Sequence, residues 1–432
     1  MNVTTAEPLK APFPYFGGKS QVADLVWSRL GNVDNYVEPF CGSAAILLRR
    51  PQPGKIETLN DANHFIVNFW RSVQQDPDAV ARYADHPVTE ADLHARHRYL
   101  MLGDAAAEFR KSIESDADYC DPKRAGWWAW GMCCWIGAGW CDATHRNSDS
   151  AQRPGEWRAA AGVGGKRPMT VLDNSQYLPG VHGEALSEQI CCLSGDGGAS
   201  GRGVTSSAGH KKRARLASHD AAGLGVHSPS GGRPQLGDAY DIGRGVNGHG
   251  DLRLCDARRA WLQGWFARLE DRLRLVRVCY GRWNRICDSR TTMTRLGITG
   301  AFLDPPYAKS LDRLAAWVAH LRGDGPEPGA AAGKANRAGG LYHGDQSQDV
   351  DRLVAEVQLW CERWGADSGV RIALCGYEGE HDALEDQGWT VEAWKAHGGY
   401  ANRNADNQNK HRERIWFSPG CLQSGDVQRE LF

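Results

Sequence analysis

The sequence predicts an α/β fold: a parallel sheet with helices on both faces, interrupted by a long insertion. Short apolar runs that are typical of strands occupy residues 35–40, 56–60, 298–303, 370–375, 389–394 and 414–417. Stretches with a helical pattern lie between or beside them, at residues 21–30, 43–50, 62–75, 349–364 and 381–387. Strands and helices that alternate in pieces of this length indicate βα units, which assemble into a parallel sheet.

The middle of the chain differs in composition from both ends, which divides the sequence into three regions. Residues 1–115 and 296–432 show the alternation and are interpreted as two halves of one sheet domain. Residues 116–295 begin with a tryptophan-rich stretch, continue into Gly/Ser-rich sequence and end in an amphipathic helix at 256–276. We expect residues 185–210 to form a flexible loop, because such composition has too few apolar side chains to form a core.

Composition excludes several classes of protein. The 432 residues carry a formal net charge of −1, so a polyanionic partner would have to meet a local cluster of positive charge. The 13 cysteines are odd in number and form no Cys-x-x-Cys pair, which favours reduced thiols and predicts no metal site. Because no apolar run reaches the roughly 18 residues that span a bilayer, we expect a soluble, cytoplasmic protein.

The strongest chemical signal is Asp304-Pro305-Pro306-Tyr307, directly after the predicted strand at 298–303. The exocyclic amine of a nucleobase is a poor nucleophile because its lone pair is delocalised into the ring. The Asp304 carboxylate and the Pro305 carbonyl would accept its two hydrogens and restore the lone pair, since the prolines keep that carbonyl out of regular pairing. Tyr307 offers a ring on which an extruded base can stack. A strand that ends in a simple Pro-Pro turn is the alternative interpretation.

Two further motifs follow the first two predicted strands. Residues 37–44 read as a strand, a glycine turn at Gly42 and a helix start, an arrangement that lets a ligand approach the backbone at the carboxyl end of a strand. Asp61 ends the second strand, and an acid at this place accepts hydrogen bonds from a ribose diol. The alternative for Asp61 is a helix N-cap.

A fourth motif, Tyr15-Phe16-Gly17-Gly18-Lys19, precedes the first strand. It is too short for a phosphate loop and stands before a strand rather than after one, which excludes a nucleoside triphosphatase of the P-loop type. Aromatic faces and a lysine instead suit a ligand that carries a sulfonium and a carboxylate.

In this order, the four motifs resemble the Dam family of N6-adenine-specific DNA methyltransferases, especially its phage-type members. These also tend to end in a sequence like Glu413-Arg-Ile-Trp-Phe-Ser-Pro419. The resemblance covers roughly residues 1–110 and 296–420. It implies a Rossmann-like S-adenosylmethionine-dependent methyltransferase sheet, with the cofactor site in the first half and the Asp-Pro-Pro-Tyr site in the second. Residues 116–295 would then be an inserted target-recognition domain.

The resemblance also implies a role for individual residues. The target base would be held by Asp304, Pro305, Pro306 and Tyr307. The S-adenosylmethionine cofactor would be contacted at its amino-acid end by Tyr15, Phe16 and Lys19. Phe40 and Gly42 would lie beneath it, Asp61 would hold its ribose, and Phe302 would lie near its adenine.

Positive charge is concentrated in residues 202–295, which hold eighteen lysines and arginines against eight aspartates and glutamates. Contact with DNA phosphates is one interpretation, and a solvated arginine-rich helix face is the other. The candidate DNA contacts are Lys211, Lys212, Arg213, Arg215 and Arg403. The tryptophans at 127, 128, 130, 135 and 140 would suit base stacking, but their helical spacing favours a buried core.

The expected activity is methylation of the N6 amine of adenine in double-stranded DNA, by base flipping and direct in-line transfer from S-adenosylmethionine. An N4-cytosine methyltransferase, an RNA substrate, and a catalytically inactive module that binds DNA or the cofactor are the alternatives. The resemblance further implies a bacterial or phage-encoded protein, for which a cognate restriction nuclease is a candidate partner.

Overall fold

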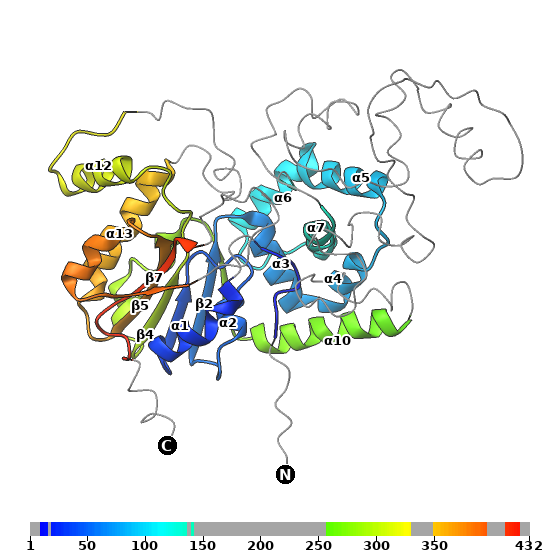
Figure 1. Cartoon of the computed structure of the whole chain (residues 1–432). Helices are drawn as coiled ribbons and strands as arrows, with labels where there is room; N and C mark the ends of the chain where they lie inside the picture. The colour runs from blue at the N-terminus through cyan, green and yellow to red at the C-terminus, as the bar shows by residue number, and fades with distance from the viewer. Residues whose placement is uncertain are drawn as a thin grey trace, which may run out of the picture.

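The computed structural model describes residues 9–15, 19–135, 140–141, 256–329, 349–394 and 411–423. Within them, seven strands form one sheet in the order β3-β2-β1-β4-β5-β7-β6, seen at the left and centre of Figure 1. The strands are β1 (Asn35–Glu38), β2 (Ile56–Asp61), β3 (Arg277–Tyr280), β4 (Thr299–Leu303), β5 (Val370–Tyr377), β6 (Thr390–Ala393) and β7 (Glu413–Phe417). Every predicted strand is present, and β3 is the strand that was not predicted.

The first five strands are parallel. β1 pairs with β2 on one side and with β4 on the other, β2 continues to β3, and β4 continues to β5. β7 runs antiparallel to both β5 and β6. The chain therefore moves away from β1 in one direction through β2 and β3, and in the other through β4 and β5. Open α/β sheets bind ligands at such a reversal, outside the carboxyl ends of the strands.

Helices cover both faces of the sheet, as predicted. Successive strand residues point to opposite faces, and the two cores follow this alternation. Tyr36 and Phe302 face α1 (Ala23–Leu30), α2 (Ala45–Leu48) and α3 (His64–Gln75), whereas Val37 and Leu303 face α13 (Val350–Gly365). α12 (Leu311–Arg322) packs on α13. The predicted α/β sheet with its covering helices is thus confirmed, and the inserted recognition domain stays a prediction.

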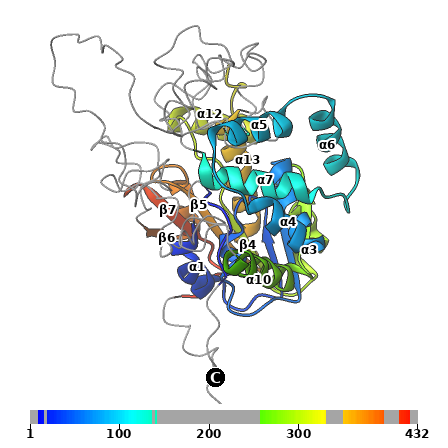
Figure 2. The ribbon, with the colours of Figure 1, turned by 90° about the vertical axis from the view of Figure 1, so that its right-hand side faces the viewer.

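A helical lobe lies beside the β2–β3 side of the sheet (Figures 1 and 2). It contains α4 (Pro77–Ala84), α5 (Glu90–Met101), α6 (Asp104–Ser115), α7 (Pro122–Cys134) and α10 (Asp256–Leu273). α7 packs against α3, α4 and α5 and lies in the middle of the lobe in Figure 2. Trp128, Trp130 and Trp140 are buried in it, and Trp140 donates its indole N–H to the Trp128 carbonyl at 3.1 Å. These tryptophans are therefore core residues, as their spacing favours.

The predicted boundaries at residues 115 and 295 cross this lobe. α7, α10 and β3 all fall within residues 116–295, but α7 and α10 pack on α3 and α4 of the first region, and β3 pairs with β2. The three-part division stays a prediction. The Gly/Ser-rich part near residues 185–210 lies outside the described residues.

Short elements complete the described chain: η1 (Lys19–Gln21), η8 (Trp283–Ile286), α11 (Arg290–Thr294) and η10 (Asp382–Gln387). In the part of the chain that the structure describes, no helix combines the length and the apolar character needed to cross a membrane.

A buried ion cluster attaches α10 to the sheet. The Glu57 carboxylate on β2 accepts two hydrogen bonds from the Arg272 guanidinium on α10, at 2.7 and 2.9 Å, and one from Arg50 at 2.9 Å. The side chains of Glu57, Arg50 and Arg272 are 5%, 1% and 10% exposed. Arg272 also donates to the Leu47 carbonyl at 3.1 Å. One carboxylate therefore pairs with two guanidinium groups that approach it from different elements.

We expect Glu57→Ala to lower the free energy of unfolding by about 3–5 kcal/mol, because it leaves two buried cations without their shared anion. Urea unfolding followed by circular dichroism measures this. Asp24→Ala is the matched control, since Asp24 pairs with Arg49 but is 79% exposed, and such surface pairs contribute about 0–1 kcal/mol. Equal urea concentrations at the midpoint of unfolding for the two variants would contradict a structural role for the cluster.

Candidate active site

The predicted motifs meet at one edge of the sheet, at the carboxyl ends of β1, β2 and β4. Glu38 ends β1, Asp61 ends β2, and Asp304 follows the last residue of β4. Since β1 and β4 are neighbours and parallel, the glycine turn after β1 and the Asp-Pro-Pro-Tyr segment after β4 leave the sheet side by side.

Asp304 contacts a lysine from near the beginning of the chain. Lys19 Nζ lies 3.0 Å from Asp304 Oδ1 and donates a hydrogen bond to Tyr307 Oη at 2.7 Å. Tyr307 Oη in turn donates to Glu413 Oε2 at 2.6 Å, and Lys19 Nζ is 3.7 Å from the same carboxylate oxygen. One cation, one hydroxyl and two carboxylates from three distant segments therefore form a single polar cluster.

The tyrosine hydroxyl has only one proton to share among its neighbours. Tyr307 Oη also lies 3.3 Å from Asp304 Oδ1, a longer contact than that to Glu413. A phenolic hydroxyl is a single donor, so the shorter contact takes the proton. Asp304 Oδ1 is left with Lys19 as its close donor in this cluster.

Burial controls the charges of these groups. The side chains of Lys19, Asp304 and Glu413 are 5%, 18% and 8% exposed. Burial raises the pKa of Asp304 above its usual range, although Lys19 and Tyr307 act against this, and it raises the pKa of Glu413 in the same way. Burial is the largest single effect and would lower the pKa of Lys19, but Asp304 and the other acidic groups around it, including Glu413, together outweigh burial and the pKa is raised. Lys19 is therefore an ammonium ion at neutral pH.

Aromatic side chains surround the cluster. The rings of Tyr307 and Tyr377 meet edge to face with centroids 4.4 Å apart, and Lys19 Nζ lies 5.3 Å from the centroid of a Trp394 ring. Rings at these distances shield the charges from water and stabilise the ammonium through their π faces.

The backbone after Tyr307 is held by two further acids. Ala308 donates its N–H to Glu380 Oε1 at 3.1 Å, and Lys309 donates its N–H to Asp351 Oδ1 at 2.6 Å. Burial raises the pKa of Glu380 to about 8. Pro305 and Pro306 are buried, and neither has an N–H to pair. The two backbone hydrogen bonds thus fix the segment at its end after Tyr307.

The turn after β1 is held by Asp61. Asp61 Oδ2 accepts a hydrogen bond from Gly42 N at 2.9 Å, and Asp61 Oδ1 accepts one from Asn63 N at 2.8 Å. The N-cap of α3 is Asn63, whose side chain accepts from Phe65 N, so the N-cap interpretation of Asp61 is wrong. Burial raises the pKa of Asp61 to about 6, although these backbone donors act to lower it.

Glycine is required at position 42. Its φ is +46°, and a Cβ there would lie 2.5 Å from the ring of Tyr15, so the aromatic ring rests directly on the turn. Nearby, the Phe40 ring is half-buried and stacks on Trp283 with centroids 6.0 Å apart and an interplanar angle of 24°. Two of the aromatic residues predicted for the cofactor site therefore flank the turn.

Asn60 joins the ends of three strands. Its Nδ2 donates to the Pro39 carbonyl after β1 and to the Gly281 carbonyl after β3, each at 3.0 Å. Its Oδ1 is buried without a hydrogen-bond partner among the described residues. A buried acceptor of this kind normally has a donor, so this edge can receive one more donor from a ligand.

The other predicted site residues differ in their placement. Phe302 is 2% exposed within the sheet core, so it packs there, and its predicted contact with the cofactor's adenine stays a prediction. Lys19 contacts Asp304, and its predicted contact with the cofactor's amino-acid end also stays a prediction. Outside the described residues lie Phe16, Lys211, Lys212, Arg213, Arg215 and Arg403.

Sequence reasoning did not identify Glu413 as part of the site. The available signal is the place of Glu413 at the start of the family-like C-terminal sequence, which by itself implies no role for this side chain. Asn60 and Trp394 were missed because neither belongs to a motif that carries chemistry.

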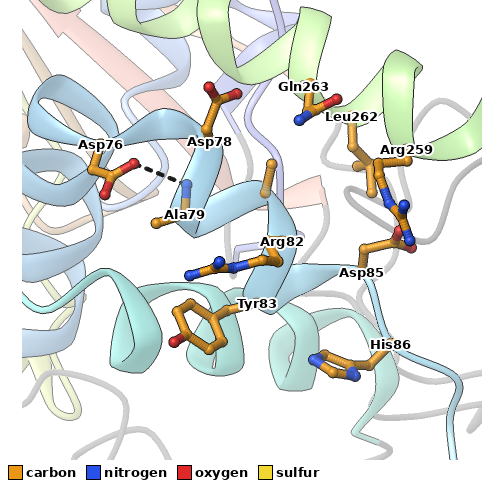
Figure 3. Close-up of a pocket in the computed structure, with 11 residues that line it drawn as sticks. Asp76, Asp78, Ala79, Arg82, Tyr83, Asp85, His86, Arg259, Leu262 and Gln263 are labelled. Carbon is orange, nitrogen blue, oxygen red and sulfur yellow. Dashed lines mark hydrogen bonds between the residues drawn. The ribbon is translucent and has the colours of Figure 1, made fainter.

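A separate cavity of about 760 Å³ lies in the helical lobe, between α4 and α10 (Figure 3). Its lining includes Asp76, Arg82, Tyr83, His86 and Arg259, and none of the motif residues. Its lining carries both acidic and basic side chains, so no ligand of one charge is favoured. The cavity is therefore not the site at the sheet edge.

Comparison with protein families agrees with the motifs. Residues 15–122 match the family described as D12 class N6 adenine-specific DNA methyltransferase. This segment contains Tyr15, Lys19, Gly42 and Asp61, whereas Asp304 and Tyr307 lie outside it and are joined to it by the contacts of Lys19. A comparison with curated proteins finds no match. Over residues 15–122 the chain is therefore similar to the D12 class of N6 adenine-specific DNA methyltransferases, a family that implies S-adenosylmethionine-dependent methylation of the N6 amine of adenine in DNA.

Proposed function

We propose that the sheet edge at the carboxyl ends of β1 and β4 is the methyl-transfer site, and that Asp304, the Pro305 carbonyl and Tyr307 hold a flipped adenine there. The observation that carries this proposal is the contact of Lys19 with Asp304 at 3.0 Å. It joins the first motif of the chain to the last and fixes the carboxylate at the sheet edge. The fixed backbone after Tyr307 supports the same assignment.

The chemistry follows from the acceptors. Asp304 and the Pro305 carbonyl accept the two hydrogens of the N6 amine, which directs the nitrogen's lone pair away from the ring. S-adenosylmethionine supplies an electrophilic methyl group on a sulfonium. The nitrogen forms its bond to the methyl carbon as the carbon–sulfur bond breaks, and it loses one proton, which Asp304 accepts. Because burial raises the pKa of Asp304, this carboxylate is a better base than an exposed one. Most of the rate comes from holding the groups in line.

The residues around Gly42 fit the cofactor. Asp61 keeps lone pairs for the ribose hydroxyls after accepting its two backbone hydrogen bonds, and the buried Asn60 Oδ1 provides a further acceptor. The half-buried ring of Phe40 and the ring of Tyr15 supply aromatic faces. Gly42 itself allows close approach to the backbone. We assign Tyr15, Phe40, Gly42 and Asp61 to the cofactor site on this basis.

DNA is the substrate of the family, and its contacts on this chain are a proposal. We propose that residues within 116–295 recognise the target, with the basic cluster Lys211, Lys212, Arg213 and Arg215 on phosphates and Arg403 near the target base. The local excess of positive charge in residues 202–295 supports this. It implies that affinity for DNA falls steeply with salt. A restriction nuclease as a partner stays a prediction.

The first test is methyl transfer to unmethylated DNA, followed by mass spectrometry of the nucleosides. We expect N6-methyladenine from the wild type and a loss of at least about a hundredfold in kcat for Asp304→Ala, because one acceptor that acts in the transition state is removed. Cofactor affinity, measured by calorimetry, serves as the folding control and is expected to persist. N4-methylcytosine as the product would agree with the proposed mechanism but show that the target base is cytosine rather than adenine.

The second test is the pH dependence of Lys19→Met. Asp304 acts as an ionised acceptor, so activity is lost as pH falls through its pKa. Lys19 acts to lower that pKa, and removing the ammonium therefore raises it. We expect the acid limb of kcat at saturating cofactor to move to higher pH by about 1–3 units. An unchanged acid limb would show that a group other than Asp304 sets it.

The third test concerns Asp61. Burial raises the pKa of Asp61 to about 6, and ribose hydroxyls bind best to the ionised carboxylate. We expect affinity for S-adenosylmethionine to fall about tenfold between pH 7 and pH 5 in the wild type, as the carboxylate becomes protonated. Calorimetry at these pH values on Asp61→Asn should show a weak affinity that no longer changes with pH. If the affinity of this variant still changed with pH, a group other than Asp61 would be responsible for the pH dependence.

A further inference from the structure

We propose that Glu413 is a positioning residue for the methyl-transfer reaction, which acts by taking the single proton of the Tyr307 hydroxyl. It thereby orients the Tyr307 ring and leaves Asp304 Oδ1, which already contacts Lys19, a lone pair with which to accept hydrogen from the target amine. This inference rests on the proposed roles of Asp304 and Tyr307.

The direction of β7 brings Glu413 to the site. The carboxyl ends of the parallel strands meet at one edge, and an antiparallel strand presents its first residue there. Glu413 is the first residue of β7 and lies opposite Tyr377, the last residue of β5. A carboxylate that begins β7 therefore faces the residues that follow β4. A parallel strand would carry the same residue to the opposite edge.

The contact between Glu413 and Tyr307 is short and shielded. The Tyr307 Oη to Glu413 Oε2 distance is 2.6 Å, within the range of charge-assisted O–H···O⁻ bonds. The Glu413 side chain is 8% exposed. The Tyr377 ring packs against the Tyr307 ring in a T-shaped arrangement, with centroids 4.4 Å apart. The hydroxyl and the ring of Tyr307 are thus both restrained, which fixes the ring on which a base would stack.

Without Glu413, the same hydroxyl has another carboxylate in reach. Asp304 Oδ1 lies 3.3 Å from Tyr307 Oη. A small rotation would let the tyrosine donate its proton there and occupy a lone pair that the amine requires. Lys19, which lies 3.7 Å from Glu413 and 3.0 Å from Asp304, would then interact with Asp304 alone. Both changes weaken Asp304 as an acceptor, so the loss is expected in kcat rather than in cofactor affinity.

Glu413→Ala, Glu413→Gln and the control Glu378→Gln test this. Glu378 lies on the loop after β5 and pairs with Arg414, but it is 61% exposed. We expect kcat to fall about a hundredfold in Glu413→Ala, the scale of a misplaced reacting group, with affinity for S-adenosylmethionine within about threefold of wild type. Glu413→Gln keeps an oxygen acceptor for the hydroxyl and should regain kcat to within about fivefold of wild type. Glu378→Gln should match the wild type.

A double-mutant cycle with Tyr307→Phe separates positioning from a general structural effect. Phenylalanine has no proton to misdirect, so Glu413→Ala should cost little further kcat in that background. Such non-additivity is the signature of two residues that act through one contact. Equal losses in both backgrounds, a Glu413→Gln variant as slow as Glu413→Ala, or a Glu413→Ala variant within about twofold of wild type would each overturn the inference.

The wild type and Asp304→Ala are measured beside these variants. If the wild type forms N6-methyladenine and Asp304→Ala does not, a normal rate in Glu413→Ala rejects only the role of Glu413. If the wild type forms no methylated base, the proposed function fails first, and the inference falls with it.

Discussion

The pairing of β1 with β4 is the constraint on which the site depends. Asn35 and Thr299 are register partners across these strands, 264 positions apart in the chain, and the Asn35 side chain donates to Thr299 Oγ1 and to the Thr292 carbonyl, each at 3.0 Å. The pairing puts the glycine turn after β1 next to Asp304 after β4. A parallel sheet aligns the carboxyl ends of its strands, so one backbone register places both the proposed cofactor turn and the candidate acceptor.

The site buries more charge than the fold needs for stability. Lys19 lies within 4 Å of two carboxylates in an aromatic surround, and desolvating such groups costs as much as their attraction returns. Elsewhere, the Glu57 cluster attaches α10 to the sheet and contains one anion for two cations. The polar cluster at Asp304 has the opposite balance, with two anions for one cation. An excess of buried acceptors does not help to stabilise a fold. It does suit the proposed site, which would have to receive the hydrogens of an amine.

The sequence predicts the sheet well because its strands are apolar runs bounded by turns. β3 was missed because Arg277–Tyr280 is short, begins with a charge and follows the helix α10 almost directly. The Asp304 motif was found because its residues are consecutive. The role of Glu413 was not, since a local pattern identifies β7 as a strand but not its direction, which depends on pairing with β5 and β6. Likewise, Asn63 and Asp61 are both plausible N-caps in sequence, and only the hydrogen bond to Phe65 decides between them.

Lys19 and Glu413 come from opposite ends of the described chain and meet at one hydroxyl, that of Tyr307. The hydrogen-bonding state of Asp304 therefore depends on η1, on the loop after β4 and on β7 together. A family match over residues 15–122 contains Lys19 but neither Tyr307 nor Glu413, so it describes only part of this arrangement. Because the tyrosine has a single proton, the two carboxylates cannot both receive it. By taking this proton, Glu413 keeps Asp304 available to the target amine in the proposed reaction. The antiparallel strand β7 would then take part in the chemistry as well as in the sheet.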